Sequence, residues 1–274
     1  MNLFDAHCHL QDKGLRQSLS EILEKWSRSN RGYLACCGTA ESDWEKVAAI
    51  ARNNPQVIAN FGIHPWKAAH LTDKWEEKLE EWLNRMPSGV GEIGLDFMDK
   101  SSDRNRQKEV FLAQLDLANQ LARPVSIHIL KAWDSFITIL KRMAPLPHGG
   151  LIHSYSGSAD MVPLFESYNL FISFSGAITN PRNKKVAKAL KAVSSNRLLV
   201  ETDSPDQIPI FPGRDLDLNP ALDLIQDQVQ INTPNNLMVI VKAAANILDL
   251  PVKNLAYQTF KNTMVLFNPI IRTS

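Results

Sequence analysis

Hydrophobic and polar positions along the chain follow two alternating periods. Short apolar or β-branched runs, typical of buried strands, are each followed by a longer stretch with apolar residues at helical spacing. The short runs predict strands at Leu3–His9, Gly32–Gly38, Val57–His64, Gly89–Asp96, Pro124–Ile129, Gly150–Ser154, Leu170–Ser175 and Arg197–Asp203. The stretches between them predict helices at Ser20–Ser29, Glu41–Arg52, Asp73–Arg85, Asn105–Ala122, Ala132–Met143, Ala159–Tyr168 and Asn183–Val193. Thr72 or Asp73 is the expected N-cap of the helix at Asp73–Arg85.

Alternation of strands and helices predicts an α/β protein with a parallel sheet. The length of 274 residues is close to the roughly 250 residues typical of the closed eight-unit barrel. We therefore predict one domain over residues 1–274 with the (β/α)8 TIM-barrel fold. An open doubly wound sheet is the alternative architecture, but no glycine-rich phosphate loop follows the first strand.

The C-terminal part of the chain continues beyond the eighth predicted strand. The loop Ser204–Asn219 contains three prolines and is expected to overhang the active-site end of the barrel. Residues after Pro220 are predicted to form the eighth helix. Two extra C-terminal helices are predicted at Asn236–Asp249 and Val252–Phe267.

Composition and charge narrow the class of protein. The chain is 44% hydrophobic and 22% charged, as in ordinary globular domains, and no apolar run approaches 18 residues, so no membrane association is expected. No basic region followed by an apolar stretch is seen near Met1, so no signal peptide is expected, and three cysteines are too few for a disulfide framework. These features predict a cytoplasmic protein. A net charge of +1 gives no overall electrostatic argument for nucleic-acid binding.

The richest local pattern is Asp5-Ala6-His7-Cys8-His9, at the end of the first predicted strand. Alternation along a strand places His7 and His9 on one face, with Asp5 beside them and Cys8 opposite. Two imidazoles on one rigid strand supply half of a metal site. Cys8 is therefore predicted to lie in the core, and Asp5 is retained as a possible partner of the ligands.

Further ligand candidates lie at the C-terminal ends of later strands, which converge on the active site of a barrel. Five of the seven histidines occupy such ends, namely His7, His9, His64, His128 and His153. Glu92 and Asp203 lie in apolar runs, where an unpaired acid is costly to bury. Because the histidines converge on the same end, a metal explains these acids better than a Lys or Arg partner.

The number of candidates exceeds what one ion requires. Four histidines and two carboxylates are more ligands than one tetrahedral ion needs, whereas two ions about 3.5–4 Å apart, bridged by a carboxylate, use them all. Imidazole and carboxylate together suit Zn²⁺ or Mn²⁺, and Mg²⁺ is favoured where carboxylates and water dominate. The predicted cofactor is thus two divalent metal ions, with Mg, Mn and Zn as candidates.

Six motifs in order resemble the TatD-type metal-dependent deoxyribonucleases, within the wider amidohydrolase-like metal barrels. They are Asp-x-His-x-His at 5–9, Gly-x-His-Pro at 62–65, Gly-Glu-x-Gly-Leu-Asp at 91–96, Pro-Val-x-x-His at 124–128, Ile-His-x-x-x-Gly-Ser at 152–158 and Glu-Thr-Asp-x-Pro at 201–205. The resemblance runs from Asp5 to roughly Asn262, nearly the whole chain. It implies metal-dependent hydrolysis of DNA, with 3′-to-5′ exonuclease action on single strands or 3′ ends.

The resemblance also implies roles for single residues. One metal would be held by His7, His9, Glu92 and Asp203, and the other by Glu92, His128 and His153, so that Glu92 bridges them. His64 would lie beside the substrate phosphate, and Glu201 would lie behind the ligands, on the same inward face as Asp203.

The chain departs from the family pattern in two places. After the fifth strand it reads His128-Ile129-Leu130-Lys131 where the family shows His-Ser-Arg, which leaves Lys131 as a weak candidate for the phosphate contact. After the eighth strand it reads Asp217-Leu218-Asn219-Pro220, without the glutamate that the family tends to place before the proline. Both departures concern the substrate rather than the metal ligands.

The predicted mechanism is attack by a metal-activated water, with Asp203 accepting its proton and His64 stabilising the phosphate charge. Trp66, Phe97 and Trp133 follow strand ends and are candidates for stacking on a base or sugar. One alternative is an amidohydrolase-like enzyme acting on a small amide, ester or lactone. A second is a non-catalytic barrel that only binds nucleic acid or protein. A monomer is expected.

Overall fold

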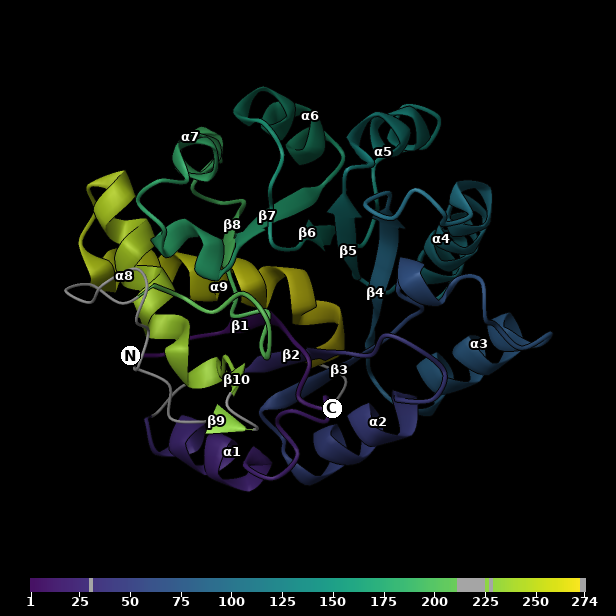
Figure 1. Ribbon diagram of the computed structural model, residues 1–274, viewed down its shortest axis with the longest axis horizontal. Coiled ribbons are helices and arrows are strands. Elements are labelled where there is room, and N and C mark those ends of the chain that lie inside the picture. Colours follow the sequence, from purple (N-terminus) through teal and green to yellow (C-terminus); the bar gives the residue numbers. More distant parts are fainter. Residues whose placement is uncertain (30–31, 211–224, 227–228, 272–274) are drawn as a thin grey trace.

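Every predicted strand is present, and each pairs in parallel with the next along the chain (Figure 1). The computed structural model describes residues 1–29, 32–210, 225–226 and 229–271. The strands are β1 (Asp5–Cys8), β2 (Leu34–Cys37), β3 (Val57–Phe61), β4 (Gly89–Asp96), β5 (Val125–Leu130), β6 (Gly150–Ile152), β7 (Leu170–Phe174) and β8 (Leu198–Val200).

The two edges of this sheet meet just beyond β8. The backbone N–H of Asp203 donates to the carbonyl oxygen of His7 at 3.0 Å, and the N–H of His9 donates to that of Ser204 at 2.8 Å. These bonds bring the first strand against the chain that follows the last one. The sheet is therefore a nearly closed barrel, and the TIM-barrel prediction is confirmed.

Helices surround the strands in chain order (Figure 1). They are α1 (Leu19–Arg28), α2 (Trp44–Asn53), α3 (Trp75–Arg85), α4 (Arg104–Gln120), α5 (Trp133–Leu140), α6 (Val162–Ser167), α7 (Lys184–Ala192), α8 (Leu237–Leu248) and α9 (Val252–Ile271). Four short 3-10 turns accompany them, at η1 (Pro65–Lys67), η2 (Ala159–Met161), η3 (Gly176–Thr179) and η4 (Pro234–Asn236). Helix α2 illustrates the packing, because its buried residues Trp44, Val47, Ala48 and Ala51 follow the helical period along one face.

Two local predictions differ from the structure. Helix α3 begins after Lys74, which makes no side-chain capping bond, whereas the sequence suggested Thr72 or Asp73 as the cap. Thr72 is engaged elsewhere, because its hydroxyl donates to Glu41 Oε2 at 2.7 Å. The stretch 159–168, predicted as one helix, is divided into η2 and α6.

The connection after β8 also differs from its prediction. Residues 225–226 and 229–230 form the short antiparallel strands β9 (Ile225–Gln226) and β10 (Val229–Gln230), not a helix, and α8 is the next helix along the described chain. Alternating β-branched and polar residues favour a strand here. Residues 211–219 of the predicted loop, and the departure at Asp217-Leu218-Asn219-Pro220, lie outside the described residues.

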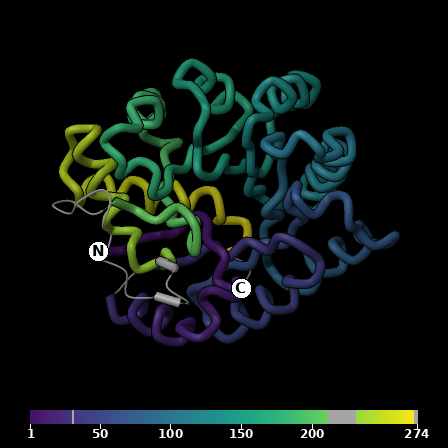
Figure 2. Tube along the Cα trace, in the orientation of Figure 1, coloured from purple at the N-terminus to yellow at the C-terminus, as the bar shows by residue number. Residues whose placement is uncertain are grey.

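Helix α9 covers the N-terminal end of the barrel. Its residues Leu266, Phe267 and Ile270 are buried in one apolar cluster with Phe4 and with residues from the strand starts, namely Ala35, Ile58, Leu151, Phe171 and Leu199. Phe4 and Phe267 stack with ring centroids 5.4 Å apart. In Figure 2 the yellow C-terminal segment accordingly passes beside the purple first strand. This end of the barrel is thus filled by hydrocarbon.

Within the described ranges, none of the helices combines the length and the apolar character that crossing a membrane requires.

Candidate metal centre

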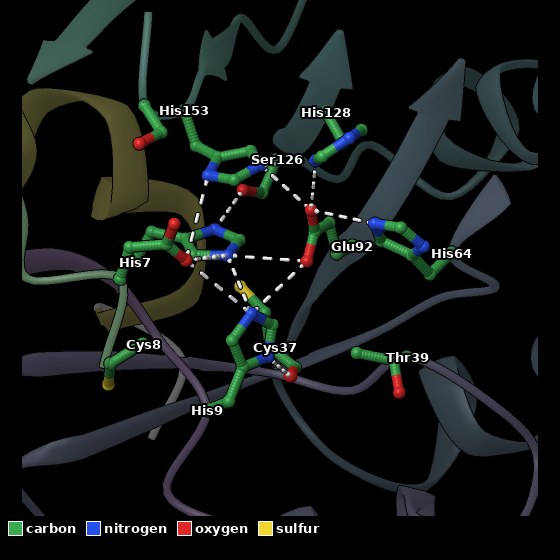
Figure 3. Close-up of polar contacts among 12 residues, drawn as sticks. His7, Cys8, His9, Cys37, Thr39, His64, Glu92, Ser126, His128 and His153 are labelled. Atoms are coloured by element: carbon green, nitrogen blue, oxygen red, sulfur yellow. Dashed lines mark hydrogen bonds and ion pairs between the residues drawn. The ribbon is translucent and has the colours of Figure 1, made fainter. Parts of the chain in front are cut away.

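The opposite end of the barrel collects the histidines and acids predicted from the sequence. The two-residue period of a strand explains their common direction. His153 lies two residues beyond the buried Leu151, and Asp203 lies four residues beyond Leu199, so each points to the same inward face as that leucine. The strand ends thereby bring together His7, His9, Glu92, His128, His153, Asp203 and, from the loop after β3, His64. Figure 3 shows Glu92 at the centre, with histidines on both sides of its carboxylate.

One oxygen of Glu92 faces the histidines of the first strand. Its Oε2 lies 3.2 Å from His9 Nε2 and 3.4 Å from His7 Nε2. The two imidazole nitrogens are 3.2 Å apart. Asp203 completes this group, because its Oδ1 lies 3.7 Å from both Nε2 atoms.

The other oxygen of Glu92 faces a second group. Its Oε1 lies 2.8 Å from His153 Nε2, 2.9 Å from His128 Nδ1 and 3.4 Å from His64 Nε2. His128 Nδ1 and His153 Nε2 are 2.9 Å apart. Glu92 therefore faces one group with each of its carboxylate oxygens, and Asp203 also approaches the second group, with its Oδ1 3.9 Å from His153 Nδ1.

Contacts behind the rings fix which nitrogen faces the centre. His9 Nδ1 donates to the carbonyl oxygen of Cys37 at 2.8 Å, and His128 Nε2 lies 3.3 Å from Asp96 Oδ2. His7 Nδ1 is 2.7 Å from Ser126 Oγ. A carbonyl or carboxylate only accepts, so the far nitrogen of His9 and of His128 carries a proton, and the near nitrogen is the one that would bind a cation.

His153 and the two remaining acids complete the surroundings. Its Nδ1 lies 3.5 Å from the fully buried Glu201 Oε1, as expected for an acid behind the ligands. Asp5, by contrast, is hydrogen-bonded to Thr202 and to the backbone of His7. Its carboxylate accepts from the backbone N–H of Thr202 at 2.8 Å and from the Thr202 hydroxyl, and burial raises the pKa of Asp5 to about 8. Asp5 thus holds the residue before Asp203.

His64 differs from the other four histidines. Its Nδ1 accepts a hydrogen bond from the backbone N–H of Trp66 at 3.2 Å. Burial lowers the pKa of His64 to about 4, so its ring is neutral at pH 7. A neutral imidazole that accepts through Nδ1 carries its proton on Nε2. His64 therefore presents an N–H donor to the centre, whereas His9 and His128 face it with the nitrogen that would bind a cation.

The electrostatics of the cluster fit divalent cations. Burial disfavours a charged Glu92, but the neighbouring histidines, His153 first, hold its pKa well below the usual range, so this acid is ionised. Burial raises the pKa of Asp203 to about 7. Lone pairs of facing imidazoles repel at 2.9–3.2 Å unless a proton or a cation lies between them. Buried nitrogen and carboxylate ligands in this arrangement are the donor set that Zn²⁺ or Mn²⁺ prefers.

A cleft of about 790 Å³ leads to the cluster and is lined by His64, Glu92, His128, His153 and Asp203 among others. Three exposed lysines that sequence reasoning did not select also line it, namely Lys13, Lys46 and Lys67. They come from the turn after β1, the first turn of α2 and η1, and no local signal marks them. Lys131, the weak candidate for a phosphate contact, is exposed but is not among the lining residues.

The three aromatic candidates for stacking differ in exposure. Trp66 lines the cleft with its side chain 67% exposed, whereas Phe97 is buried and Trp133 packs on Tyr155 and Phe165. Only Trp66 of the three offers a free ring face. Cys8 is fully buried and its thiol donates to the carbonyl oxygen of Ala35, in agreement with its predicted place in the core.

The described geometry can be compared with known proteins. A family model for TatD related DNase matches residues 4–268. The chain belongs to this family. The resemblance seen in the six motifs is thereby confirmed, and with it a metal-dependent hydrolase in a TIM barrel.

Individual members of the TatD family are similar over nearly their whole length. An uncharacterized metal-dependent hydrolase, YabD of Bacillus subtilis, is 27% identical over 97% of this chain and 98% of its own. A 3′-5′ ssDNA/RNA exonuclease, TatD of Erwinia tasmaniensis, is 27% identical over 97% and 100%. The crystal structure of YjjV, a TatD homolog from Escherichia coli, superposes with a TM-score of 0.86 at 28% identity, covering 97% and 98%.

Proposed function

We propose that this TatD-family hydrolase cleaves phosphodiester bonds of DNA and removes nucleotides from the 3′ end of single strands. The observation that carries the proposal is the shared carboxylate of Glu92, with one oxygen toward each of two ligand groups. A two-metal site with a common bridge is a recurring arrangement for in-line displacement at phosphorus. The exonuclease name of the Erwinia relative supports the choice of a nucleic acid.

The residues are assigned as follows. His7, His9, Glu92 and Asp203 would hold one divalent ion, and Glu92, His128 and His153 would hold the other. Such ions, when bound, make a water molecule acidic near neutral pH and offset the charge of the phosphate.

The protein's own groups then complete the chemistry. We assign Asp203, which lines the cleft, as the acceptor of the proton that the attacking water loses. His64 donates its Nε2–H to a phosphate oxygen as negative charge develops there. The proton is on Nε2 because Nδ1 accepts a hydrogen bond from Trp66. The lysines at 13, 46 and 67 attract the phosphates of the strand into the cleft.

The test is turnover of single-stranded DNA labelled at either end, measured with Mg²⁺, Mn²⁺ and Zn²⁺ in separate reactions. A 3′ label should appear first as a mononucleotide, and a 5′ label should give a ladder of shortening fragments. Asp203→Asn should abolish turnover. His64→Gln should lower kcat by about 10²–10³-fold, as loss of one transition-state donor does elsewhere, while bound metal stays at the wild-type level.

Results of three kinds would contradict the proposal. One is a panel of lactones and amides that are turned over faster than DNA, which favours the amidohydrolase-like alternative. Another is wild-type turnover in Asp203→Asn with excess metal. The third is a protein that binds no metal and shows no activity in any of the three ions, as expected for a barrel that only binds a partner.

A further inference from the structure

A second cavity lies directly beside the metal cleft. It has a volume of about 500 Å³, within the range of small-molecule sites. Trp66 and Leu130 line both hollows, so these two side chains stand between the cavity and the cleft. Apart from the shared Trp66, none of the predicted site residues lines this second cavity.

Trp66 is held in a fixed orientation although it is exposed. Its indole Nε1–H donates to Asp96 Oδ2 at 2.7 Å, and its backbone N–H donates to His64 Nδ1 at 3.2 Å. The Trp66 and His64 rings make an edge-to-face contact with centroids 4.6 Å apart. Trp66 nevertheless remains 67% exposed. A tryptophan whose indole N–H is anchored while most of its surface is exposed is preorganised for stacking.

A second bare apolar group lines the same cavity. Met98, two residues beyond the end of β4, is 56% exposed, and its backbone N–H is fixed by a 2.8 Å bond to Asp96 Oδ1. Thioether and indole together form walls that suit a flat aromatic ligand. Trp66 and Met98 are thus two large exposed hydrophobic residues on one hollow, a combination that usually marks a binding site.

Charge distinguishes the cavity from the cleft. Three lysines line the cleft beside its acids, whereas the described lining of the second cavity contains Asp96, Asp99 and Asp103 and neither lysine nor arginine. A phosphate is therefore disfavoured in the second cavity. A neutral aromatic group whose N–H donors can face carboxylates is favoured there.

We propose that the second cavity is a nucleobase subsite, in which the base of the bound nucleotide stacks on Trp66 while its phosphate lies in the metal cleft. The proposal rests on the proposed function for the identity of the ligand. In this subsite, Trp66 and Met98 would bind the base of the nucleotide and would not contact the phosphodiester.

The first test measures binding without turnover. Deoxyadenosine 5′-monophosphate and 2-deoxyribose 5-phosphate, which differ only in the base, are titrated by calorimetry into the Mn²⁺-loaded enzyme. The nucleotide should bind about tenfold more tightly or better, because stacking of one base on an aromatic side chain supplies an effect of that size. Equal affinity for the two ligands would overturn the proposal.

Matched variants isolate the ring face. Trp66→Phe and Trp66→Leu both lose the hydrogen bond to Asp96, but only Trp66→Phe keeps an aromatic surface. The preference for the nucleotide should persist in Trp66→Phe and disappear in Trp66→Leu. Met98→Ala should reduce it by a smaller factor, about twofold to fivefold. A preference that survives in Trp66→Leu contradicts the subsite.

The second test separates failure of the subsite from failure of the proposed function. Single-stranded DNA with an ordinary 3′ nucleotide is compared with DNA whose 3′ nucleotide lacks its base. A lower kcat/KM on the abasic end, with the difference lost in Trp66→Leu, supports the subsite. Equal processing of both ends overturns the subsite but leaves the nuclease intact. Selective nucleotide binding with no cleavage of either DNA supports the subsite and overturns the nuclease.

Discussion

The two ends of one barrel are built from the same strands and have opposite chemistry. On the inward face of β8, Leu199 belongs to the apolar cluster under α9, and Glu201, two residues later, contacts the histidine group. Likewise Leu151 at β6 is followed by His153. The polarity of the interior therefore reverses within two positions along a strand, a rise of about 7 Å.

The reversal has a physical consequence for each end. The N-terminal end gains stability from buried hydrocarbon, of which each large side chain contributes a few kcal/mol. The C-terminal end buries Glu92, Asp96, Glu201, Asp203 and several imidazoles, and such groups are costly unless they are paired or bind a cation. Stability and chemistry thus occupy separate ends, and substitutions at the two ends should have separable effects.

The largest effect is expected at the shared carboxylate. Glu92→Gln keeps the shape but removes the charge that both ligand groups face, so metal binding should fall and kcat should drop by about 10⁴-fold, or about 5.4 kcal/mol in activation free energy. Metal content by mass spectrometry and DNA turnover measure this. Ser173→Ala is the matched control, because Ser173 is buried on β7 and its hydroxyl has no hydrogen-bond partner among the described residues. Full activity in Glu92→Gln would contradict the assignment of the chemistry to the C-terminal end of the barrel.

The next effect is expected at the apolar end. Phe267→Ala removes a fully buried ring that stacks on Phe4, so the free energy of unfolding should decrease by about 3–5 kcal/mol. Urea denaturation followed by circular dichroism measures the change, and kcat per folded molecule should remain at the wild-type value. Val265→Ala on the same helix, 61% exposed, should change stability by less than about 0.5 kcal/mol. A large loss of kcat in folded Phe267→Ala would show that the ends are coupled.

The smallest effect should come from a residue behind the ligands. Asp96→Asn weakens the acceptor that orients His128, so affinity for metal should fall by about 10–100-fold with little change in the free energy of unfolding. Competition with a metal chelator measures the affinity. The control is Asp134→Asn, an exposed acid on α5 away from the cluster. Unchanged affinity in Asp96→Asn would mean that His128 needs no such support.

Local periodicity made much of this molecule predictable. Alternation along short apolar runs located all eight strands, and it placed His7, His9 and Asp203 at the strand ends where they are found. Errors fell where the pattern is weak or competes with distant contacts. Thr72, for example, was expected to cap a helix, but its hydroxyl donates a hydrogen bond to Glu41, which lies in the connection between β2 and α2.

Several features of the site could not be read from the chain in order. Asp96 and Ser126 stand in strands as ordinary polar residues, and their roles depend on which imidazole lies opposite. Lys13, Lys46 and Lys67 share one cleft only because the turn after β1, the start of α2 and η1 meet there. Lys131, adjacent to a ligand strand, does not line that cleft, although its place in the motif suggested a phosphate contact.

The sequence by itself determined the order of the eight strands, the residue types that gather at their C-terminal ends and the family, because the period of side chains along an element is a local property. The tertiary structure decided which atoms meet. It divided the histidines between the two oxygens of Glu92, gave His64 a donor proton through the backbone of Trp66, and left the Trp66 ring bare between two cavities. These outcomes depend on distances between residues far apart in the chain, which closure of the barrel fixes and local pattern does not encode.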